Sequence, residues 1–382
     1  MKSAIFDIQK IDGGARLGSV TTPHGVFETP AFMPVATQGS VKTLAPDELK
    51  EAGVQIVLSN AYHLALRPGV DVIEAMGGLH KFMGWDRPIL TDSGGFQTFS
   101  LGRLHKFDDD GISFRSHIDG SEQFLTPEMC MNYQERLGVD IAMVLDQCPP
   151  YELDTALMKE TLNRTHQWAA RSKGMYKLGG PAMFGIVQGG LSVNLRKEST
   201  DFLVSLDFDG YALGGLSVGE PKAQMYELVQ MVDEMLPPGS PRYLMGVGSP
   251  EDIVVCSGYG IDMFDSTLPT RVARHGGLLT RLGRVNILGA RFEKDEGPIE
   301  YECDCYACGR FSRSYIHHLF KAREFLAYRL ATIHNLRFMV CLIDDIKKAI
   351  KQENFHNFKK EFLAKYRVAD EETRLRERRS RV

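Results

Sequence analysis

Eight short apolar runs, separated by segments with the spacing of amphipathic helices, limit the folds open to this 382-residue chain. We expect helices over residues 46–53, 126–138, 154–173 and 222–236. The runs themselves lie at residues 31–37, 55–60, 88–92, 140–146, 182–188, 210–215, 242–246 and 261–265. Short apolar runs that alternate with helices are typical of parallel βα units, whose strands are buried on both faces. Eight such units predict an α/β fold of the (β/α)8 barrel type.

Polar and glycine residues at the ends of these runs predict where a functional site lies. In a (β/α)8 barrel the carboxyl ends of the strands meet at one rim, and active sites are built there. Six runs end in this way, at Asp92, Asp146, Gln188, Gly214–Gly215, Gly246 and Asp265. Asp and Gly also end strands because they favour turns. Six such residues in register nevertheless favour a site over turn chemistry.

Four segments of the predicted rim suit a planar, purine-like base. Residues 91–97 read TDSGGFQ, in which Asp92 supplies a carboxylate and Phe96 a face for stacking. Residues 143–151 read MVLDQCPPY and add Asp146 and Cys148, although a cysteine here also fits a small buried thiol. The segments IVQGG (186–190) and LGGLSVGE (213–220) add Gln188 and backbone N–H donors. Together these donors and acceptors match the edge of a guanine.

Two carboxylates on one rim, Asp92 and Asp265, support double displacement at a glycosidic carbon. One carboxylate attacks as the nucleophile, and the other transfers the proton of the departing and entering groups. Either residue could instead be a structural salt-bridge partner, because the two come from different predicted strands.

Basic residues follow the last predicted strand. The segment FDSTLPTR (264–271) ends in Arg271, and Arg274 lies three residues further on, both within reach of phosphates. Residues 270–294 hold six Lys or Arg against one acidic residue, and residues 309–323 hold four against none. The whole chain has a net charge of −4, so this asymmetry predicts a local phosphate-binding patch. The basic residues 374–382 are better explained as a solvated tail.

Residues 303–308 (CDCYAC), which are followed by Gly309, predict a metal site. Three thiolates and one imidazole match a closed tetrahedral Zn²⁺ site, which is structural because no position is left for water. We assign the ligands to Cys303, Cys305, Cys308 and His334, since the segment around His334 has the pattern of a helix that could close back on the thiolates. The nearer His317 and His318 are the alternatives for the fourth ligand.

Nothing in the sequence predicts a membrane segment. No stretch approaches the roughly 18 uncharged apolar residues of a transmembrane helix. The segment MKSAIFDIQK has no apolar run long enough for a signal peptide, so we expect a cytoplasmic protein.

The motifs TDSGGFQ, LDQCPPY, IVQGG, LGGLSVGE, FDSTLPTR and CDCYACGR, taken together, resemble those of tRNA-guanine transglycosylases, also called queuine tRNA-ribosyltransferases, of the bacterial type. The resemblance covers residues from about 3 to about 365. It implies a pentosyltransferase that replaces guanine at the wobble position of GUN anticodons by the free 7-deazaguanine base preQ1, through a covalent ribosyl-aspartate. It also implies a homodimer in which the second subunit helps to hold the tRNA, and one structural Zn²⁺ per subunit.

The resemblance implies a role for each site residue. Asp265 is similar to the nucleophile that attacks the ribose C1′, and Asp92 to the general acid and base. RNA contacts are implied for Gly246, Arg271 and Arg274. Contacts with the exchanged base are implied for Asp92, Phe96, Asp146, Cys148, Gln188, Gly215, Leu216 and Met245, with Phe96 and Met245 on its two faces.

The sequence departs from the family pattern at three positions near the base. Gln147 and Pro149 replace the Glu and Thr of a bacterial DECTPY segment, and Phe96 stands where Tyr is common. Cys148 stands where the eukaryotic catalytic subunit has Val, which favours preQ1 over the bulkier queuine. Exchange of queuine remains an alternative, as do a non-catalytic zinc-stapled tRNA-binding protein and a sugar hydrolase on the same barrel. We expect a barrel over residues 1–300, a zinc subdomain over 301–350, and a C-terminal helix with a basic tail over 351–382.

Overall fold

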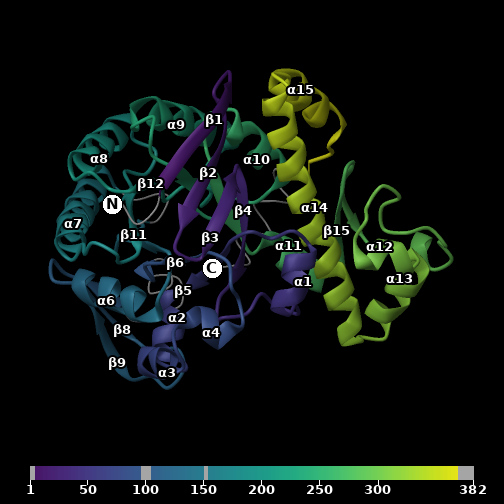
Figure 1. The fold of residues 1–382 in the computed structure, drawn as a ribbon, viewed down its shortest axis with the longest axis horizontal. Coiled ribbons are helices and arrows are strands. Elements are labelled where there is room, and N and C mark those ends of the chain that lie inside the picture. The colour runs from purple at the N-terminus through teal and green to yellow at the C-terminus, as the bar shows by residue number, and fades with distance from the viewer. Residues whose placement is uncertain (1–4, 96–104, 150–153, 369–382) are drawn as a thin grey trace.

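A closed barrel of eight parallel strands forms the centre of the molecule (Figure 1). The computed structural model describes residues 5–95, 105–149 and 154–368. The barrel strands are β4 (Ala31–Ala36), β5 (Val57–Asn60), β6 (Ile89–Asp92), β10 (Ile141–Met143), β11 (Ala182–Val187), β12 (Gly210–Leu213), β13 (Arg242–Leu244) and β14 (Met263–Ser266). Pairing of β14 with β4 closes the barrel. Each strand falls on one of the eight apolar runs, so the predicted (β/α)8 barrel is confirmed.

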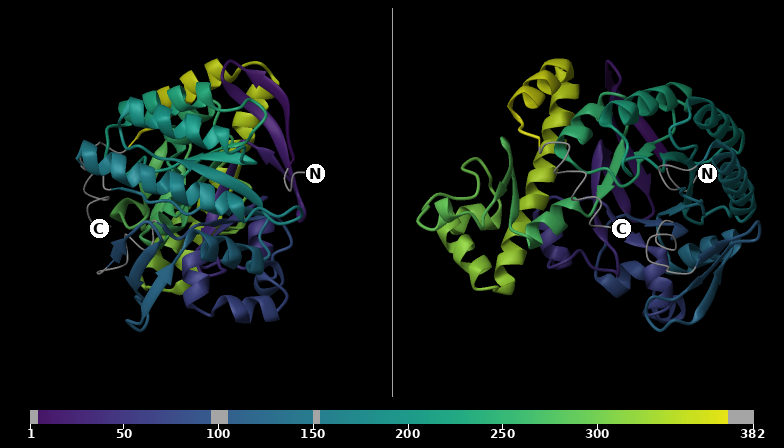
Figure 2. Two further views of the ribbon diagram at one scale, coloured as in Figure 1. Left: turned by 90° about the vertical axis from the view of Figure 1, so that its left-hand side faces the viewer. Right: turned by 180° about the vertical axis from the view of Figure 1, so that it is seen from behind.

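Burial of the strands on both faces explains why the runs are continuously apolar. Every residue of β4 and of β11 is buried, and the barrel strands contribute to one large hydrophobic core. Helices cover the outside of the barrel, as the views in Figures 1 and 2 show. These helices are α1 (Pro46–Glu51), α2 (Ala61–Leu66), α3 (Val70–Ala75), α4 (Leu79–Met83), α6 (Pro127–Leu137), α7 (Thr155–Gly174), α8 (Val193–Ser205), α9 (Lys222–Met235), α10 (Pro250–Ser257) and α11 (Leu268–Arg274).

Local sequence signals set the ends of the helices. For α6, the Thr126 hydroxyl accepts a hydrogen bond from the Met129 N–H, and Pro127 takes the first helical position. Gly138 ends the helix with a φ of 71°, a conformation that glycine adopts without strain. The four helices predicted from the sequence are confirmed as α1, α6, α7 and α9.

Two three-stranded antiparallel sheets outside the barrel were not predicted. One joins β1 (Ile5–Asp12), β2 (Ala15–Thr22) and β3 (Gly25–Thr29). It lies at the amino end of the barrel, because Arg16 pairs with Asp262 and His24 with Asp140, and both acids precede barrel strands. The other joins β7 (His105–Phe107), β8 (Ile112–Arg115) and β9 (Glu122–Leu125).

A long helix joins the C-terminal part of the chain to the barrel. Helix α14 (Phe325–Lys351) packs against α11 and β4 on one side and against α12 and α13 on the other, and both figures show it standing between the two parts. The other elements here are β15 (Gly277–Thr280), β16 (Gly283–Asn286), η1 (Ala290–Phe292), α12 (Tyr306–Arg310), α13 (Arg313–Lys321) and α15 (Phe355–Lys365). The three-part division of the chain stays a prediction. None of the helices in the described ranges is both long and apolar enough to cross a membrane.

Candidate active site and zinc centre

Asp265 is held by two donors from a neighbouring strand and its loop. It lies in β14 and is 8% exposed. The Tyr243 hydroxyl and the Gly246 N–H each donate a hydrogen bond of 2.6 Å to its Oδ1. Among the described residues, no hydrogen bond reaches Oδ2, so this oxygen keeps its lone pairs for a ligand. Burial raises the pKa of Asp265, while the two donors act in the opposite direction.

Asp92, the second carboxylate, is held by the turn that follows the neighbouring strand. It ends β6 and is buried. The Asn60 amide donates a hydrogen bond to its Oδ2, and the Ala61 N–H donates one of 3.2 Å to Oδ1. The Asn60 side chain was not predicted to belong to the site. Asn60 nevertheless ends the apolar run 55–60, so the rule that selected the other rim residues would also have selected it.

Asp146 and Gln188 come together in a buried polar cluster. The Gln188 amide nitrogen donates a 2.7 Å hydrogen bond to Asp146 Oδ2, and the Ser93 hydroxyl donates one of 3.2 Å to Oδ1. Burial raises the pKa of Asp146. The Gln188 Oε1 is buried and has no hydrogen-bond partner within the described part of the chain. A buried amide oxygen without a partner is costly, which indicates a place for a ligand donor.

Glycines let the backbone approach Asp146 and Gln188 closely. A Cβ on Gly215 would lie 2.4 Å from Gln188 Oε1, and the φ of Gly215 is 63°. A Cβ on Gly95 would lie 2.4 Å from the Asp146 carbonyl oxygen. Larger residues at either position would therefore displace Gln188 or the backbone at Asp146.

A fully buried arginine, which the sequence did not single out, holds the two glycine-containing loops. Arg196 in α8 has no exposed surface, and burial lowers its pKa to about 10. Its guanidinium donates hydrogen bonds to the carbonyl oxygens of Val187 (2.9 Å), Gly190 (2.9 Å) and Gly214 (2.8 Å). No sequence signal identifies this role, since Arg196 reads as one of several polar residues of a surface helix.

The other residues predicted to contact the base are buried or half-buried, except for one that lies outside the described ranges. Cys148 and Leu216 are buried, and burial raises the pKa of Cys148 to about 12, so it is a neutral thiol. Met245 is half-buried, and its N–H bonds to the Leu213 carbonyl oxygen. Phe96 lies outside the described residues.

The residues predicted to contact RNA differ in what they already bind. Gly246 uses its N–H to hold Asp265. Arg274 is half-buried and donates a 2.9 Å hydrogen bond to the Thr270 carbonyl oxygen. Arg271 lines a cavity of about 130 Å³ beside Gly246, which Arg284 and Arg367 also line. The cavity reaches Ser266, the residue after Asp265, and the acidic Glu251 and Asp252 line it together with the cationic side chains.

The predicted zinc ligands converge on one point. The Sγ atoms of Cys303, Cys305 and Cys308 lie 3.6, 3.7 and 3.3 Å from His334 Nδ1. A tetrahedral Zn²⁺ with ordinary Zn–S and Zn–N bond lengths requires about 3.6 Å between such atoms. These distances and the soft donor set fit Zn²⁺, and all four positions are filled by protein.

Hydrogen bonds behind His334 select it as the fourth ligand. Its Nε2–H donates a 2.7 Å hydrogen bond to the Leu279 carbonyl oxygen, which leaves the Nδ1 lone pair facing the thiolates. The alternative ligand His317 instead uses its Nδ1 in a 2.7 Å hydrogen bond to the Ile287 carbonyl oxygen. Neither His317 nor His318 joins the cluster in the described part of the chain. The assignment of His334 is confirmed.

Comparison with known proteins agrees with this geometry. The family model for queuine tRNA-ribosyltransferase matches residues 12–368. A queuine tRNA-ribosyltransferase of Dehalococcoides mccartyi is 51% identical over 377 residues, which are 99% of this chain and 96% of that protein. The enzyme of the same name from Thermoanaerobacter pseudethanolicus is 54% identical over 358 residues, 94% of this chain and 96% of the relative. The relative from Desulforudis audaxviator is 52% identical over 363 residues, 94% and 98% of the two chains. The chain therefore belongs to the queuine tRNA-ribosyltransferase family.

Proposed function

We propose that this enzyme exchanges guanine at the wobble position of GUN-anticodon tRNAs for preQ1, with Asp265 as the nucleophile. The observation that carries the proposal is the asymmetry of the Asp265 carboxylate. Two donors fix Oδ1 at 2.6 Å, and Oδ2 is left for attack. A pre-oriented carboxylate of this kind suits displacement at a sugar carbon, and the family relationship supplies the sugar and the base.

In the first half of the reaction the glycosidic bond is replaced by an ester. Asp265 Oδ2 attacks C1′ of the ribose, the C1′–N9 bond breaks, and the electron pair leaves with guanine N9. Asp92, in its protonated form, donates the proton that the departing guanine takes up. The wobble base must leave the anticodon stack to reach the rim, and this costs less in an unpaired loop than in a duplex.

The second half reverses these steps with a different base. Asp92, now a carboxylate, removes the N9 proton of preQ1, N9 attacks C1′, and Asp265 leaves as a carboxylate. The donors from Asn60 and Ala61 suit this role, because they stabilise the ionised form of Asp92 between the two steps.

The buried polar groups of Asp146 and Gln188 suit the edge of the exchanged base. We assign the Asp146 carboxylate and the free Gln188 Oε1 to the N–H donors of guanine or preQ1, with Gly215 and Leu216 supplying the pocket wall. Phe96 and Met245 are proposed to lie on the two faces of the base. We place the neutral, buried thiol of Cys148 beside the 7-substituent, and we propose that it favours the small aminomethyl group over queuine.

Binding of the anticodon is assigned to the basic groups beside Asp265. Arg271 and Arg274 are proposed to contact the RNA, and Gly246 to lie against it. The zinc centre has no open coordination position, so its role is to hold the fold. We further propose a homodimer that acts in the cytoplasm, where its tRNA substrate is found.

The decisive experiment is base exchange with labelled tRNA. Release of labelled guanine from a GUN-anticodon tRNA should require an added base, and preQ1 should drive it at lower concentration than queuine. Wild-type protein should form a covalent adduct with the tRNA that Asp265→Asn lacks, while the variant still binds tRNA. Binding of tRNA without guanine release would favour a non-catalytic role, and cleavage of an aryl glycoside without RNA would favour a hydrolase.

A further inference from the structure

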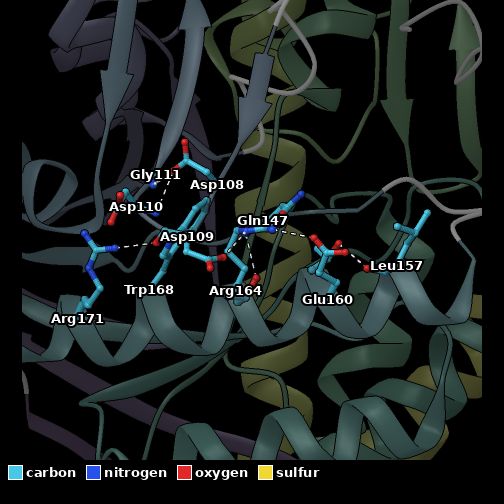
Figure 3. A network of polar contacts seen from close by, with 12 residues as sticks. Asp108, Asp109, Asp110, Gly111, Gln147, Leu157, Glu160, Arg164, Trp168 and Arg171 are labelled. Carbon is cyan, nitrogen blue, oxygen red and sulfur yellow. Dashed lines mark hydrogen bonds and ion pairs between the residues drawn. The ribbon is translucent and has the colours of Figure 1, made fainter.

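One arginine on the outer helix α7 reaches the loop that carries Asp146 (Figure 3). The Arg164 side chain is 12% exposed, and its Nη1 donates a 2.8 Å hydrogen bond to the side-chain oxygen of Gln147. The same guanidinium pairs with Glu160 at 2.9 Å and with Asp109 at 3.4 Å. Arg164 therefore joins the loop after β10 to α7 and to the β7–β8 loop.

Gln147 is anchored to α7 at two points. Besides the bond from Arg164 to its side chain, its backbone N–H donates a 3.1 Å hydrogen bond to the Thr165 hydroxyl. The next residue back along the chain is Asp146. Gln188 and Ser93 therefore hold the Asp146 carboxylate directly. Helix α7 holds the adjacent residue, Gln147, and so fixes the loop that carries Asp146.

We propose that Arg164 is a positioning residue that, through Gln147, fixes Asp146 for binding of the incoming base. The inference rests on the proposed base exchange. A buried carboxylate that reads a base edge must be held within a fraction of an ångström of its productive place, and this requires supporting hydrogen bonds behind it. Gln147 turns its amide towards Arg164, so it acts on the base through Asp146 and not by direct contact (Figure 3).

The identity of residue 147 follows from this arrangement. A side chain here must accept a hydrogen bond from a guanidinium, which Gln does through its amide oxygen and Glu would do through a carboxylate. Replacement by Glu keeps the acceptor and makes the bond charge-assisted. Gln147→Glu should therefore preserve base binding, whereas Gln147→Ala should impair it.

The test measures base exchange at saturating tRNA for Arg164→Ala, Gln147→Ala, the double variant and Gln147→Glu. We expect Arg164→Ala to raise the KM for preQ1 about tenfold, as loss of one hydrogen bond from a charged group predicts, with a much smaller change in kcat. Gln147→Ala should have a similar effect, and the double variant should be little worse than either, because both changes remove the same bond. The affinity for tRNA should not change.

A matched control lies on the same face of the same helix. Arg171 donates a 2.8 Å hydrogen bond to the Asp109 carbonyl oxygen and pairs with Glu128, and none of these bonds reaches residues 146–148. Arg171→Ala should loosen the β7–β8 loop and leave the KM for preQ1 unchanged. Thermal unfolding of each variant separates lost stability from lost positioning.

The outcomes distinguish this inference from the proposed function. If wild-type protein exchanges bases and Arg164→Ala has the wild-type KM for preQ1, the inference is wrong while the function stands. It is also wrong if Arg171→Ala raises the KM as much as Arg164→Ala does, or if the effects of Arg164→Ala and Gln147→Ala add. Absence of exchange by the wild-type protein would instead refute the proposed function.

Discussion

Replacement of Tyr243 by Phe removes one of the two donors that hold Asp265. The tyrosine is 1% exposed, and its hydroxyl lies 2.6 Å from Asp265 Oδ1. Phenylalanine keeps the ring and its packing, and the Gly246 N–H still bonds to the same oxygen. The substitution therefore tests the electrostatic support of the nucleophile with little change in the core.

The magnitude follows from the strength of a hydrogen bond to a charged group. Such a bond contributes about 1.5–3 kcal/mol, and one pKa unit corresponds to about 1.4 kcal/mol. Loss of the Tyr243 hydroxyl should thus raise the pKa of Asp265 by about one to two units beyond the rise that burial already causes. Because Asp265 attacks only as the carboxylate, the rate falls as the pH drops through this pKa. The acid limb of the pH–rate profile should move to higher pH by about one to two units.

Single-turnover formation of the covalent adduct, followed across the pH range, is the suitable assay because it isolates the attack of Asp265. At high pH the variant should approach the wild-type rate, and at low pH it should fall well below it. Tyr211→Phe is the control, since Tyr211 is equally buried in the adjacent strand β12 and has no hydrogen bond to Asp265. An unchanged acid limb in Tyr243→Phe, or an equal shift in Tyr211→Phe, would refute the reasoning.

Four further substitutions test the nucleophile, the base contacts, the basic residues and the zinc centre. Asp265→Asn should abolish exchange and leave the protein at least as stable as the wild type at neutral pH. Burial raises the pKa of the Asp265 carboxyl, so the free energy of unfolding falls as the pH rises through this pKa. Calorimetry should show that the Asn variant lacks this pH-dependent loss of stability. Gly215→Ala should push the Gln188 amide from its place and raise the KM for the base by more than about tenfold in exchange kinetics, since the new Cβ would lie 2.4 Å from Oε1. Arg271→Ala should reduce the slope of log Kd for tRNA against log salt by about one unit. His334→Gln should lower the zinc content measured by metal analysis, and its exchange activity should follow the fraction of folded protein.

The barrel could be predicted from the sequence because its strands obey one simple rule. A strand that is buried on both faces must be apolar throughout, and β11 shows this at every residue. The strands β3, β7, β8 and β9 lack that signal because they carry exposed residues, as Ile112–Arg115 does. Strands of three to five residues of this kind resemble ordinary loops in a single sequence.

The residues of the site also divide into those that the sequence pattern could predict and those that it could not. Residues that end apolar runs, such as Asp92 and Asp265, are marked by their position, and Asn60 carries the same mark. Arg196 and Arg164 act through contacts with loops that are distant in the sequence, so their helices show only polar residues at helical spacing. Pairing between a helix side chain and a loop carbonyl leaves no local pattern.

The zinc centre and α11, the helix that we propose to bind RNA, are coupled through two adjacent residues of α14. His334 faces the three thiolates and donates to the Leu279 carbonyl oxygen in β15. Asn335 accepts from the Leu279 N–H and donates to the Pro269 carbonyl oxygen in the first turn of α11, which carries Arg271. Both side chains are fully buried, so neither can turn without breaking these bonds. The zinc centre therefore holds the fold where α14, β15 and α11 meet, and its supporting hydrogen bonds extend to the helix that carries Arg271.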